Sequence, residues 1–150
     1  RVREAGKLRI VHDFSGKPVG VNGELLHLLL DRGYAPVLTV PILDEEGRAV
    51  NSENDDIVAA LQLELRAEVV VQLLEAPGFL ESSDDPDSVV GEIGRAELER
   101  REQQVEGRMK RKLLAIRKLL DAGAARVILA DGRVEHPVRD ALAGRGTLIH

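Results

Sequence analysis

The sequence predicts a three-layer α/β domain in which helices cover both faces of a mainly parallel β-sheet. Apolar runs typical of strands alternate along the chain with helical patterns, which favours a parallel sheet with crossover helices. The run at residues 69–74 is apolar except for one glutamine, as expected for a strand buried on both faces. At 150 residues, the chain is long enough to form one domain with a sizeable core.

The first third of the chain predicts an edge strand, a helix and a short buried strand. Residues 8–12 alternate well enough for an edge strand, and residues 1–5 would complete a hairpin with it. Asn22 is a favourable N-cap for a leucine-rich helix, and Gly33 ends that helix. Residues 36–40 have the composition of a short buried strand.

The rest of the chain continues this alternation. A second helix is expected at residues 54–66, because Asp55 and Asp56 fall in its first turn, where carboxylates are favoured. The other expected elements are a tight turn at 44–47, an acidic loop at 81–92, a polar helix at 95–104, a helix from Gly107 to about Asp121, a strand at 126–130, a helix near 136–143 and a final strand around 147–149. Ligands of such sheets bind beyond the carboxyl ends of the strands, where glycine-bearing turns occur at 75–78 and 131–133.

Composition argues against several classes of function. The chain has no cysteine, so it can form neither disulfides nor a thiolate zinc site, and its four histidines lack metal-ligand spacing. No apolar run approaches the length of a membrane span and no secretory signal opens the chain, so we expect a cytoplasmic protein without a membrane partner. The three aromatic residues are too few for nucleic-acid binding by base stacking.

An unusual charge cluster opens the helix expected from Gly107. The first residues, Gly-Arg-Met-Lys-Arg-Lys, place four cations at a helix N-terminus, although the partial positive charge there favours Asp and Glu. A bound phosphate would make this arrangement favourable. The alternative is a solvated basic turn, in which a lysine stem covers apolar surface.

Helical phase distinguishes Lys112 from the other cations of this cluster. At about 100° per residue, one stripe carries the apolar side chains that should pack inward, namely Met109, Leu113, Ile116 and Leu120. Lys112 lies beside this stripe, whereas Lys110 and Arg111 point away from it. We therefore expect Lys112 to extend over a buried edge and into a cleft.

Two further segments have side chains suited to ligands. Residues 51–56 combine amides, a hydroxyl and free helix N–H groups that could bind a carboxylate or a phosphate, although a doubled N-cap explains them equally well. Residues 75–80 form a turn that could face a nucleotide. Together with Lys112, these segments indicate phosphoryl transfer, which depends on positioning and positive charge more than on covalent chemistry.

Charge is unevenly distributed along the chain. The net charge is −5, yet residues 1–17 carry a local balance of +3. A basic edge on an acidic protein suggests a docking surface for an acidic partner. An exposed edge strand protected by charge is an equally good explanation.

Several segments resemble the C-terminal part of the amino acid kinase family, and together they cover nearly the whole chain. The similar motifs are V-N-x-x-L-L at 20–30, N-x-N-A-D at 49–55, a strand and D-V-P-G loop at 72–80, G-G-M-x-x-K at 107–112, I-x-D-G-R at 128–133 and G-x-G-T at 144–147. The resemblance implies the amino acid kinase (carbamate kinase-like) fold without its N-terminal lobe. Residues 1–150 would then be the C-terminal, nucleotide-binding portion of the domain.

The resemblance also implies roles for individual residues. Lys112 matches the lysine that stabilises the transferring phosphoryl group, Asp55 matches the aspartate that organises the catalytic lysines, and Asn51 matches the asparagine that holds the substrate amino acid. The nucleotide-binding loop of the family matches Glu75, Ala76, Pro77, Gly78, Phe79 and Leu80. Two motifs depart from the family pattern, because Leu74-Glu75 replaces Ser/Thr-Asp and Glu53 replaces the second asparagine.

The resemblance further implies an ATP-dependent kinase that makes an acyl phosphate on a side-chain carboxylate, with Mg²⁺ bridging the ATP phosphates and few protein ligands for the metal. The form Gly-Arg-Met-Lys-Arg-Lys is similar to family members of lysine biosynthesis that phosphorylate α-aminoadipate linked to LysW, an acidic amino-group carrier protein, and such a partner would give the basic segment 1–17 a use. The alternatives are an acetylglutamate kinase of arginine biosynthesis and a nucleotide-binding fragment without catalysis. We expect residues 1–150 alone to be inactive and the complete enzyme to be a homo-oligomer.

Overall fold

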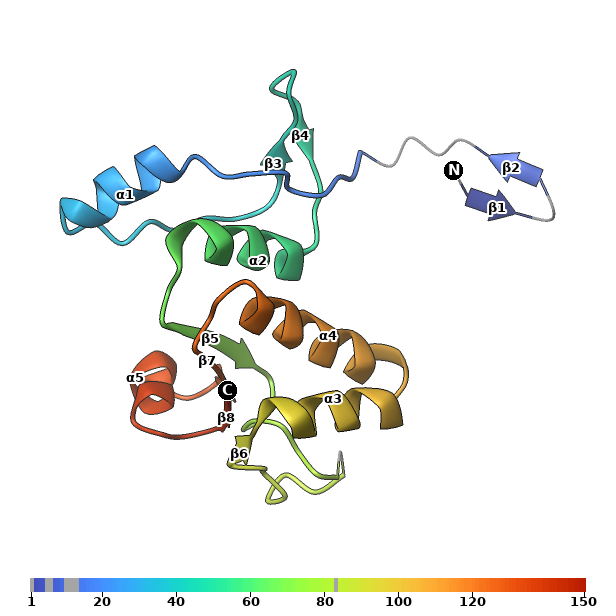
Figure 1. Cartoon of the computed structure of the whole chain (residues 1–150), viewed down its shortest axis with the longest axis vertical. Helices are drawn as coiled ribbons and strands as arrows, with labels where there is room; N and C mark the ends of the chain where they lie inside the picture. The colour runs from blue at the N-terminus through green and yellow to red at the C-terminus, as the bar shows by residue number, and fades with distance from the viewer. Residues whose placement is uncertain (1, 5–6, 10–13, 83) are drawn as a thin grey trace. The chain divides into compact units, whose positions relative to one another are not determined.

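The computed structural model describes residues 2–4, 7–9, 14–82 and 84–150 (Figure 1). Side chains are described from Phe14 onward, apart from those of Ser83, Arg108 and Met109. The chain divides into two compact units, residues 1–57 and 58–150. None of the helices in the described ranges combines the length and the apolar character that a bilayer-spanning segment needs.

The first unit contains two short antiparallel hairpins. β1 (Val2–Glu4) pairs with β2 (Lys7–Arg9), and β3 (Ile42–Leu43) pairs with β4 (Ala49–Val50). The N-terminal hairpin expected from the sequence is confirmed over these residues. Residues 10–12, which were expected to extend its second strand, lie outside the described residues.

The helices of residues 23–65 begin where the sequence predicts. α1 (Gly23–Asp31) is capped by Asn22, whose Oδ1 accepts a hydrogen bond of 3.0 Å from the backbone N–H of Leu25. α2 (Asn54–Leu65) has Asp55 and Asp56 in its first turn, where negative charge offsets the partial positive charge of the helix N-terminus. Both predicted helices are therefore confirmed to within about two residues.

The turn before β4 is also confirmed, and a single carboxylate organises it. The backbone N–H of Gly47 donates to the carbonyl oxygen of Asp44 at 3.0 Å. The Asp44 side chain accepts hydrogen bonds of 2.9 Å from the backbone N–H groups of Glu46 and Arg48. Because Gly47 has a φ of +76°, a residue without a side chain suits this position.

The strand predicted at residues 36–40 is wrong. These residues form no strand, and the side chains of Val37 and Leu38 are 93% and 53% exposed. A strand requires a hydrogen-bonded neighbour, and no described segment pairs with this one. Pro36 and Pro41 at its two ends also lack the backbone N–H that a ladder would use.

The second unit is organised around a four-stranded sheet with the order β5-β7-β8-β6. The strands are β5 (Val69–Leu74), β6 (Glu92–Ile93), β7 (Arg126–Asp131) and β8 (Thr147–Ile149). β5 pairs with β7 in parallel and β6 pairs with β8 in parallel, whereas β7 and β8 are antiparallel. The sheet is therefore mainly parallel, as predicted, with one antiparallel pairing at its centre.

Helices cover both faces of this sheet and give the predicted three layers. α3 (Arg95–Gln104) and α4 (Gly107–Asp121) lie on one face, and α5 (Pro137–Leu142) lies on the other (Figure 1). Alternate residues of β7 face the two layers, as the twofold period of a strand requires. Val127 and Leu129 pack in the larger core with α3 and α4, while Ile128 and Ala130 pack with Ala141 of α5.

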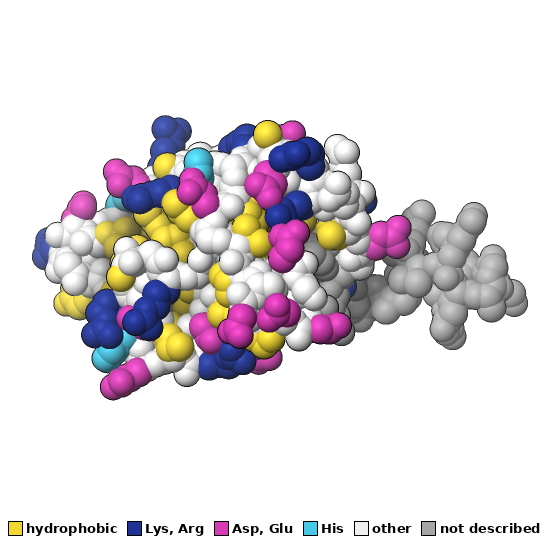
Figure 2. Space-filling view, turned by 90° about the horizontal axis from the view of Figure 1, so that it is seen from below, with side chains coloured by type: hydrophobic (Ala, Val, Ile, Leu, Met, Phe, Trp, Pro, Cys, Tyr) yellow, Lys and Arg dark blue, Asp and Glu magenta, His cyan; other side chains and the backbone are white. Residues whose placement is uncertain are grey.

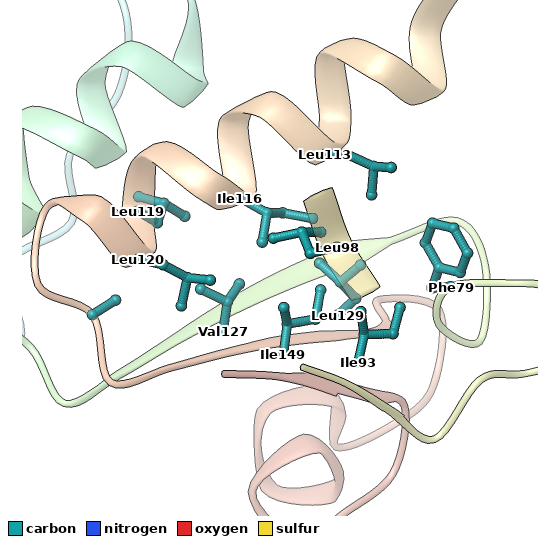
Figure 3. Packing of buried hydrophobic residues seen from close by; sticks show 11 residues of the cluster. Phe79, Ile93, Leu98, Leu113, Ile116, Leu119, Leu120, Val127, Leu129 and Ile149 are labelled. Carbon is teal, nitrogen blue, oxygen red and sulfur yellow. The ribbon is translucent and has the colours of Figure 1, made fainter. Parts of the chain in front are cut away.

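α4 contributes more buried residues to the larger core than any other element. The apolar stripe predicted from the helical period is confirmed at Leu113, Ile116 and Leu120, which are at most 5% exposed; the side chain of Met109 lies outside the described ones. These side chains belong to the same buried cluster as Leu129 and Ile149 of the sheet, and Leu120 lies beside Val127 (Figure 3). Burial of each leucine or isoleucine contributes roughly 1.5–3 kcal/mol to folding.

The prediction that β5 is buried on both faces is wrong. Its residues are only partly buried, and the side chain of Leu73 is 44% exposed. β5 is the edge strand of the described sheet, with β7 as its neighbour on one side. A strand made of apolar residues can therefore lie beside the core without having both of its faces buried.

Gly146 should be the glycine of the second unit that tolerates substitution least. Its φ is +102°, and a Cβ there would collide with the carbonyl oxygen of Leu129. We predict that Gly146→Ala lowers the free energy of unfolding by about 3 kcal/mol or more, measured by urea denaturation. Gly144→Ala is the matched control, because its φ is +95° but its Cβ would meet open space.

Gly144→Ala should therefore cost only about 1–2 kcal/mol, the cost of the backbone conformation alone. Equal losses of stability in the two variants would contradict this account, because they would show that the contact with Leu129 adds nothing to the backbone cost.

Candidate functional site

The second unit contains a cavity of about 670 Å³ beyond the carboxyl end of β5. Residues of the β5 end and the following loop form one part of its wall, and residues of α3, the α3–α4 connection and α4 form another. The lining residues are Leu74, Ala76, Gly78, Phe79, Leu80, Glu81, Arg101, Gln104, Val105 and Lys112. This is the edge of the sheet at which α/β folds of this type bind ligands.

The loop at residues 75–80 is held against the sheet by backbone groups. The carbonyl oxygen of Phe79 accepts a hydrogen bond of 2.8 Å from the backbone N–H of Val90. The backbone N–H of Phe79 donates to Oγ1 of Thr147, also at 2.8 Å. The phenyl ring is 6% exposed and belongs to the larger core, so the loop is anchored by burial as well as by hydrogen bonds.

Four of the six residues predicted for the nucleotide loop line the cavity. Ala76, Gly78, Phe79 and Leu80 contribute to its wall, and the other two do not. Glu75 is exposed, and Pro77 instead lines a smaller cavity of about 300 Å³. The two faces of the same loop therefore border different spaces.

Lys112 is half-buried and lines the same cavity as the loop. It precedes Leu113, which is fully buried, so the packing of α4 determines the direction of the lysine stem. Lys110 and Arg111 are exposed, as the helical phase predicts. Glu106, the N-cap of α4, makes no side-chain capping bond, and the first turn contains no acidic residue. The described side chains of this helix end therefore include no acidic group within the first turn.

Arg101 is a site residue that the sequence analysis missed. Its guanidinium lies 5.2 Å from the ring centroid of Phe79, and it forms ion pairs with Glu81 at 2.8 Å and Glu97 at 2.7 Å. Burial lowers the pKa of Arg101, but the hydrogen bonds to Glu81 and Glu97 outweigh it and raise the pKa above its ordinary value. The spacing of Glu97 and Arg101, four residues apart on a helix, is the only part of this arrangement visible in sequence.

The glycine-bearing turn after β7 forms a closed ion pair. Arg133 donates to both carboxylate oxygens of Asp131, at 2.8 Å from Nε and 2.7 Å from Nη2. Its backbone N–H adds a third bond to the same carboxylate at 2.9 Å. These hydrogen bonds lower the pKa of Asp131 to about 2. Because its carboxylate is occupied by Arg133, we assign this turn a structural role.

Asn51 and Asp55 belong to the first unit, whereas Lys112 and the loop belong to the second. Asn51 lines a cavity of about 300 Å³ together with Lys17, Ser52 and other residues of 15–17 and 51–56. Its backbone is fixed by hydrogen bonds with Phe14 at 2.7 Å and Gly16 at 2.8 Å. Asp55 is exposed on the first turn of α2 and does not line this cavity, although its neighbour Asp56 does.

Several charged side chains elsewhere on the second unit form ion pairs. Arg95 and Asp121 form an ion pair of 2.7 Å, and Arg145 and Asp140 form one of 3.2 Å. On the face shown in Figure 2, basic and acidic side chains are interspersed with exposed apolar ones. No group of three or more His, Asp or Glu among the described side chains is arranged to hold a metal ion.

Comparisons of sequence identify relatives for nearly the whole chain. The sequence profile of the amino acid kinase family matches residues 2–131. The chain is 42% identical over 149 residues to a LysW-aminoadipate kinase of Thermus thermophilus, which covers 97% of this chain and 55% of that protein. It is 33% identical over 144 residues to an acetylglutamate kinase of a Synechococcus species, covering 92% of this chain and 49% of that protein. The chain thus spans about half the length of the curated relatives it matches.

Comparisons of structure agree on the fold. N-acetylglutamate synthase from Neisseria gonorrhoeae matches 99% of this chain and 39% of its own, with a TM-score of 0.73 and 20% identity. A Giardia carbamate kinase matches 90% of this chain and 50% of its own, with a TM-score of 0.71 and 20% identity. The fold is therefore the amino acid kinase fold, which confirms the predicted class.

Arg101 should stabilise the wall of the cavity through Phe79 and Glu81. We predict that Arg101→Ala lowers the free energy of unfolding by about 1–2 kcal/mol in urea denaturation, because it removes a cation–π contact and two ion pairs. Arg100→Ala is the matched control, since Arg100 is the exposed neighbour on the same helix. An effect of Arg100→Ala as large as that of Arg101→Ala would contradict the assignment.

The Asp131–Arg133 ion pair should make the stability of the protein depend on pH. The pKa of Asp131 is lowered in the folded state, so its contribution to stability is complete above about pH 4 and is lost as the pH falls through about 2. We predict that the melting temperature of Asp131→Asn lies below that of the original protein at pH 5 and that the difference narrows toward pH 2. A difference that stays constant over this range would contradict the ionic role of the pair.

Proposed function

The chain belongs to the amino acid kinase family, and we propose on this basis that the full-length protein is an ATP-dependent kinase that phosphorylates a side-chain carboxylate to an acyl phosphate. Residues 1–150 would supply its C-terminal, nucleotide-binding portion. One observation carries the proposal most directly. Lys112 lines the same cavity as Ala76, Gly78, Phe79 and Leu80, although the loop and the lysine come from distant parts of the sequence.

The cavity combines the two properties that a nucleoside triphosphate needs. Leu74, Ala76 and Val105 give it apolar surface, which suits a base. Lys112 gives it positive charge close to the N-terminal turn of α4, which suits the phosphates. In this proposal the Lys112 ammonium stabilises the negative charge that spreads over the phosphoryl group as it transfers.

Magnesium would enter with ATP. A divalent cation bridging the phosphates neutralises part of their charge and needs few protein ligands, because Mg²⁺ retains most of its bound water. The described residues include no group of three or more His, Asp or Glu that could hold a metal ion, so the ATP phosphates and water would supply its ligands. The residues of this chain would therefore act on the phosphates through Lys112 and the N–H groups of α4.

The roles proposed for the first unit rest on the motif at residues 49–55. We propose that Asn51 holds the substrate amino acid and that Asp55 orients the catalytic lysines. The cavity that Asn51 lines also contains Lys17, and the combination of an amide and a cation suits a carboxylate. These roles differ from the role of Lys112, so substitutions of Asn51 or Asp55 should have kinetic effects that differ from those of a Lys112 substitution.

We propose carrier-linked α-aminoadipate as the substrate, and a LysW-type acidic carrier protein as the partner. The 42% identity with the Thermus thermophilus relative supports this choice. The basic segment 1–17 supports it as well, because a positive surface favours an acidic partner. Acetylglutamate is the second candidate substrate, supported by 33% identity with an acetylglutamate kinase.

Lys112→Ala tests the catalytic role. We predict that it lowers the kcat of the full-length enzyme by about 10²–10³-fold, as removal of a group that stabilises the transition state does. Lys110→Ala is the matched control, because Lys110 is exposed on the same turn and does not line the cavity; its kcat should stay within about twofold of the original. Activity that survives Lys112→Ala would refute the proposed role.

Turnover with different acceptors tests the substrate. We predict that the full-length enzyme has a higher kcat/KM with α-aminoadipate on its carrier protein than with free acetylglutamate, measured as ADP release. Preference for free acetylglutamate would favour the second candidate.

We also predict negligible turnover by residues 1–150 alone, and robust turnover by this chain would contradict its assignment as a portion of the catalytic domain.

A further inference from the structure

Thr147 connects the loop at residues 75–80 to the last strand of the sheet. Its side chain is completely buried at the start of β8, and its Oγ1 accepts a hydrogen bond of 2.8 Å from the backbone N–H of Phe79. The two residues are 68 positions apart in sequence. Thr147 does not line the cavity, so it can influence a ligand there only through the loop.

The hydrogen bond to Thr147 is the first one after β5 that holds the loop to another segment of the chain. Within the described part of the chain, residues 75–78 make no backbone hydrogen bond to another segment. Phe79 is then fixed on both sides, because its N–H donates to Thr147 and its carbonyl oxygen accepts from Val90. The position of the loop therefore depends on these two bonds and on the buried phenyl ring.

Close packing shows that the loop lies directly against β8. A Cβ on Gly78 would come within 2.7 Å of Thr147 Oγ1 and 3.0 Å of Cγ1 of Val89. It would also lie 3.2 Å from the backbone nitrogen of Thr147, so rotation of the threonine could not relieve the contact. Because Gly78 has no side chain, the hydroxyl of Thr147 can come close enough to accept the backbone N–H of the next residue, Phe79.

We propose that Thr147 is a positioning residue for nucleotide binding. By accepting the N–H of Phe79, it holds residues 76–80 as one wall of the cavity that Lys112 also lines. The inference rests on the proposed function, since it takes the cavity to be the ATP site. Without the hydroxyl, a buried N–H loses its partner, and the loop must move to restore a hydrogen bond.

The test compares two substitutions of Thr147 in the full-length protein. Thr147→Val keeps the shape of the side chain but removes the acceptor, whereas Thr147→Ser keeps the acceptor and removes a methyl group. Mg-ATP affinity is measured by calorimetry, and exchange of the Phe79 amide hydrogen is measured by NMR. Ile128→Val is the matched control, because Ile128 lies in the core on the α5 side of the sheet and away from the loop.

We expect Thr147→Val to weaken Mg-ATP binding roughly tenfold and to speed exchange of the Phe79 amide, because a lost buried hydrogen bond has an effect of about this size. Thr147→Ser should bind Mg-ATP within about twofold of the original protein. Ile128→Val should lower the melting temperature without changing Mg-ATP affinity. Faster exchange with unchanged affinity in Thr147→Val would overturn the proposal, as would equal losses of affinity in the Val and Ser variants.

Gly78→Ala keeps the proposal testable if Thr147→Val does not fold. It pushes the loop away from β8 and leaves Thr147 in place, so it should also weaken Mg-ATP binding; an unchanged affinity would overturn the inference. Absence of Mg-ATP binding by the original protein would instead overturn the proposed function and this inference with it. If the original protein and Thr147→Val instead bind Mg-ATP equally well, only the proposed role of Thr147 is contradicted.

Discussion

The packing of α4 on the sheet is the constraint on which the candidate site depends. Leu113, Ile116 and Leu119 are at most 1% exposed and belong to the same buried cluster as Val127, Leu129 and Ile149 of the sheet (Figure 3). A rotation of α4 by one residue would expose several such side chains, each contributing roughly 1.5–3 kcal/mol. The rotational phase of the helix is therefore fixed, and with it the direction in which Lys112, the residue before Leu113, leaves the core.

The other wall of the cavity is held by polar contacts. Thr147 fixes the backbone of Phe79, and Arg101 lies over the ring of the same residue while pairing with Glu81 and Glu97. Phe79 is thus the point at which β8, α3 and the loop meet. The loop and α4 share the larger core through Phe79, but the hydrogen bond to Thr147 belongs to the loop alone. A substitution that removes this bond can therefore loosen the loop and leave the buried stripe of α4 unchanged.

Local patterns allowed part of this structure to be predicted from sequence. Asn22 identified the start of α1, and the helical period identified both the buried stripe of α4 and the side chain, Lys112, that lines the cavity. Long-range pairing was less accessible. Residues 36–40 have the composition of a strand but no described partner, and the exposure of β5 follows from its place at the edge of the sheet. Arg101 and Thr147 were missed because their contacts with Phe79 join segments far apart in the chain.

A crystal structure of the full-length protein with Mg²⁺ and a non-hydrolysable ATP analogue tests the central claim most directly. The account predicts that the nucleotide occupies the cavity beyond β5, with a phosphate oxygen within hydrogen-bonding distance of Lys112 Nζ and the loop at residues 75–80 in contact with the nucleoside. A nucleotide bound elsewhere, or one whose phosphates do not contact Lys112, would contradict it.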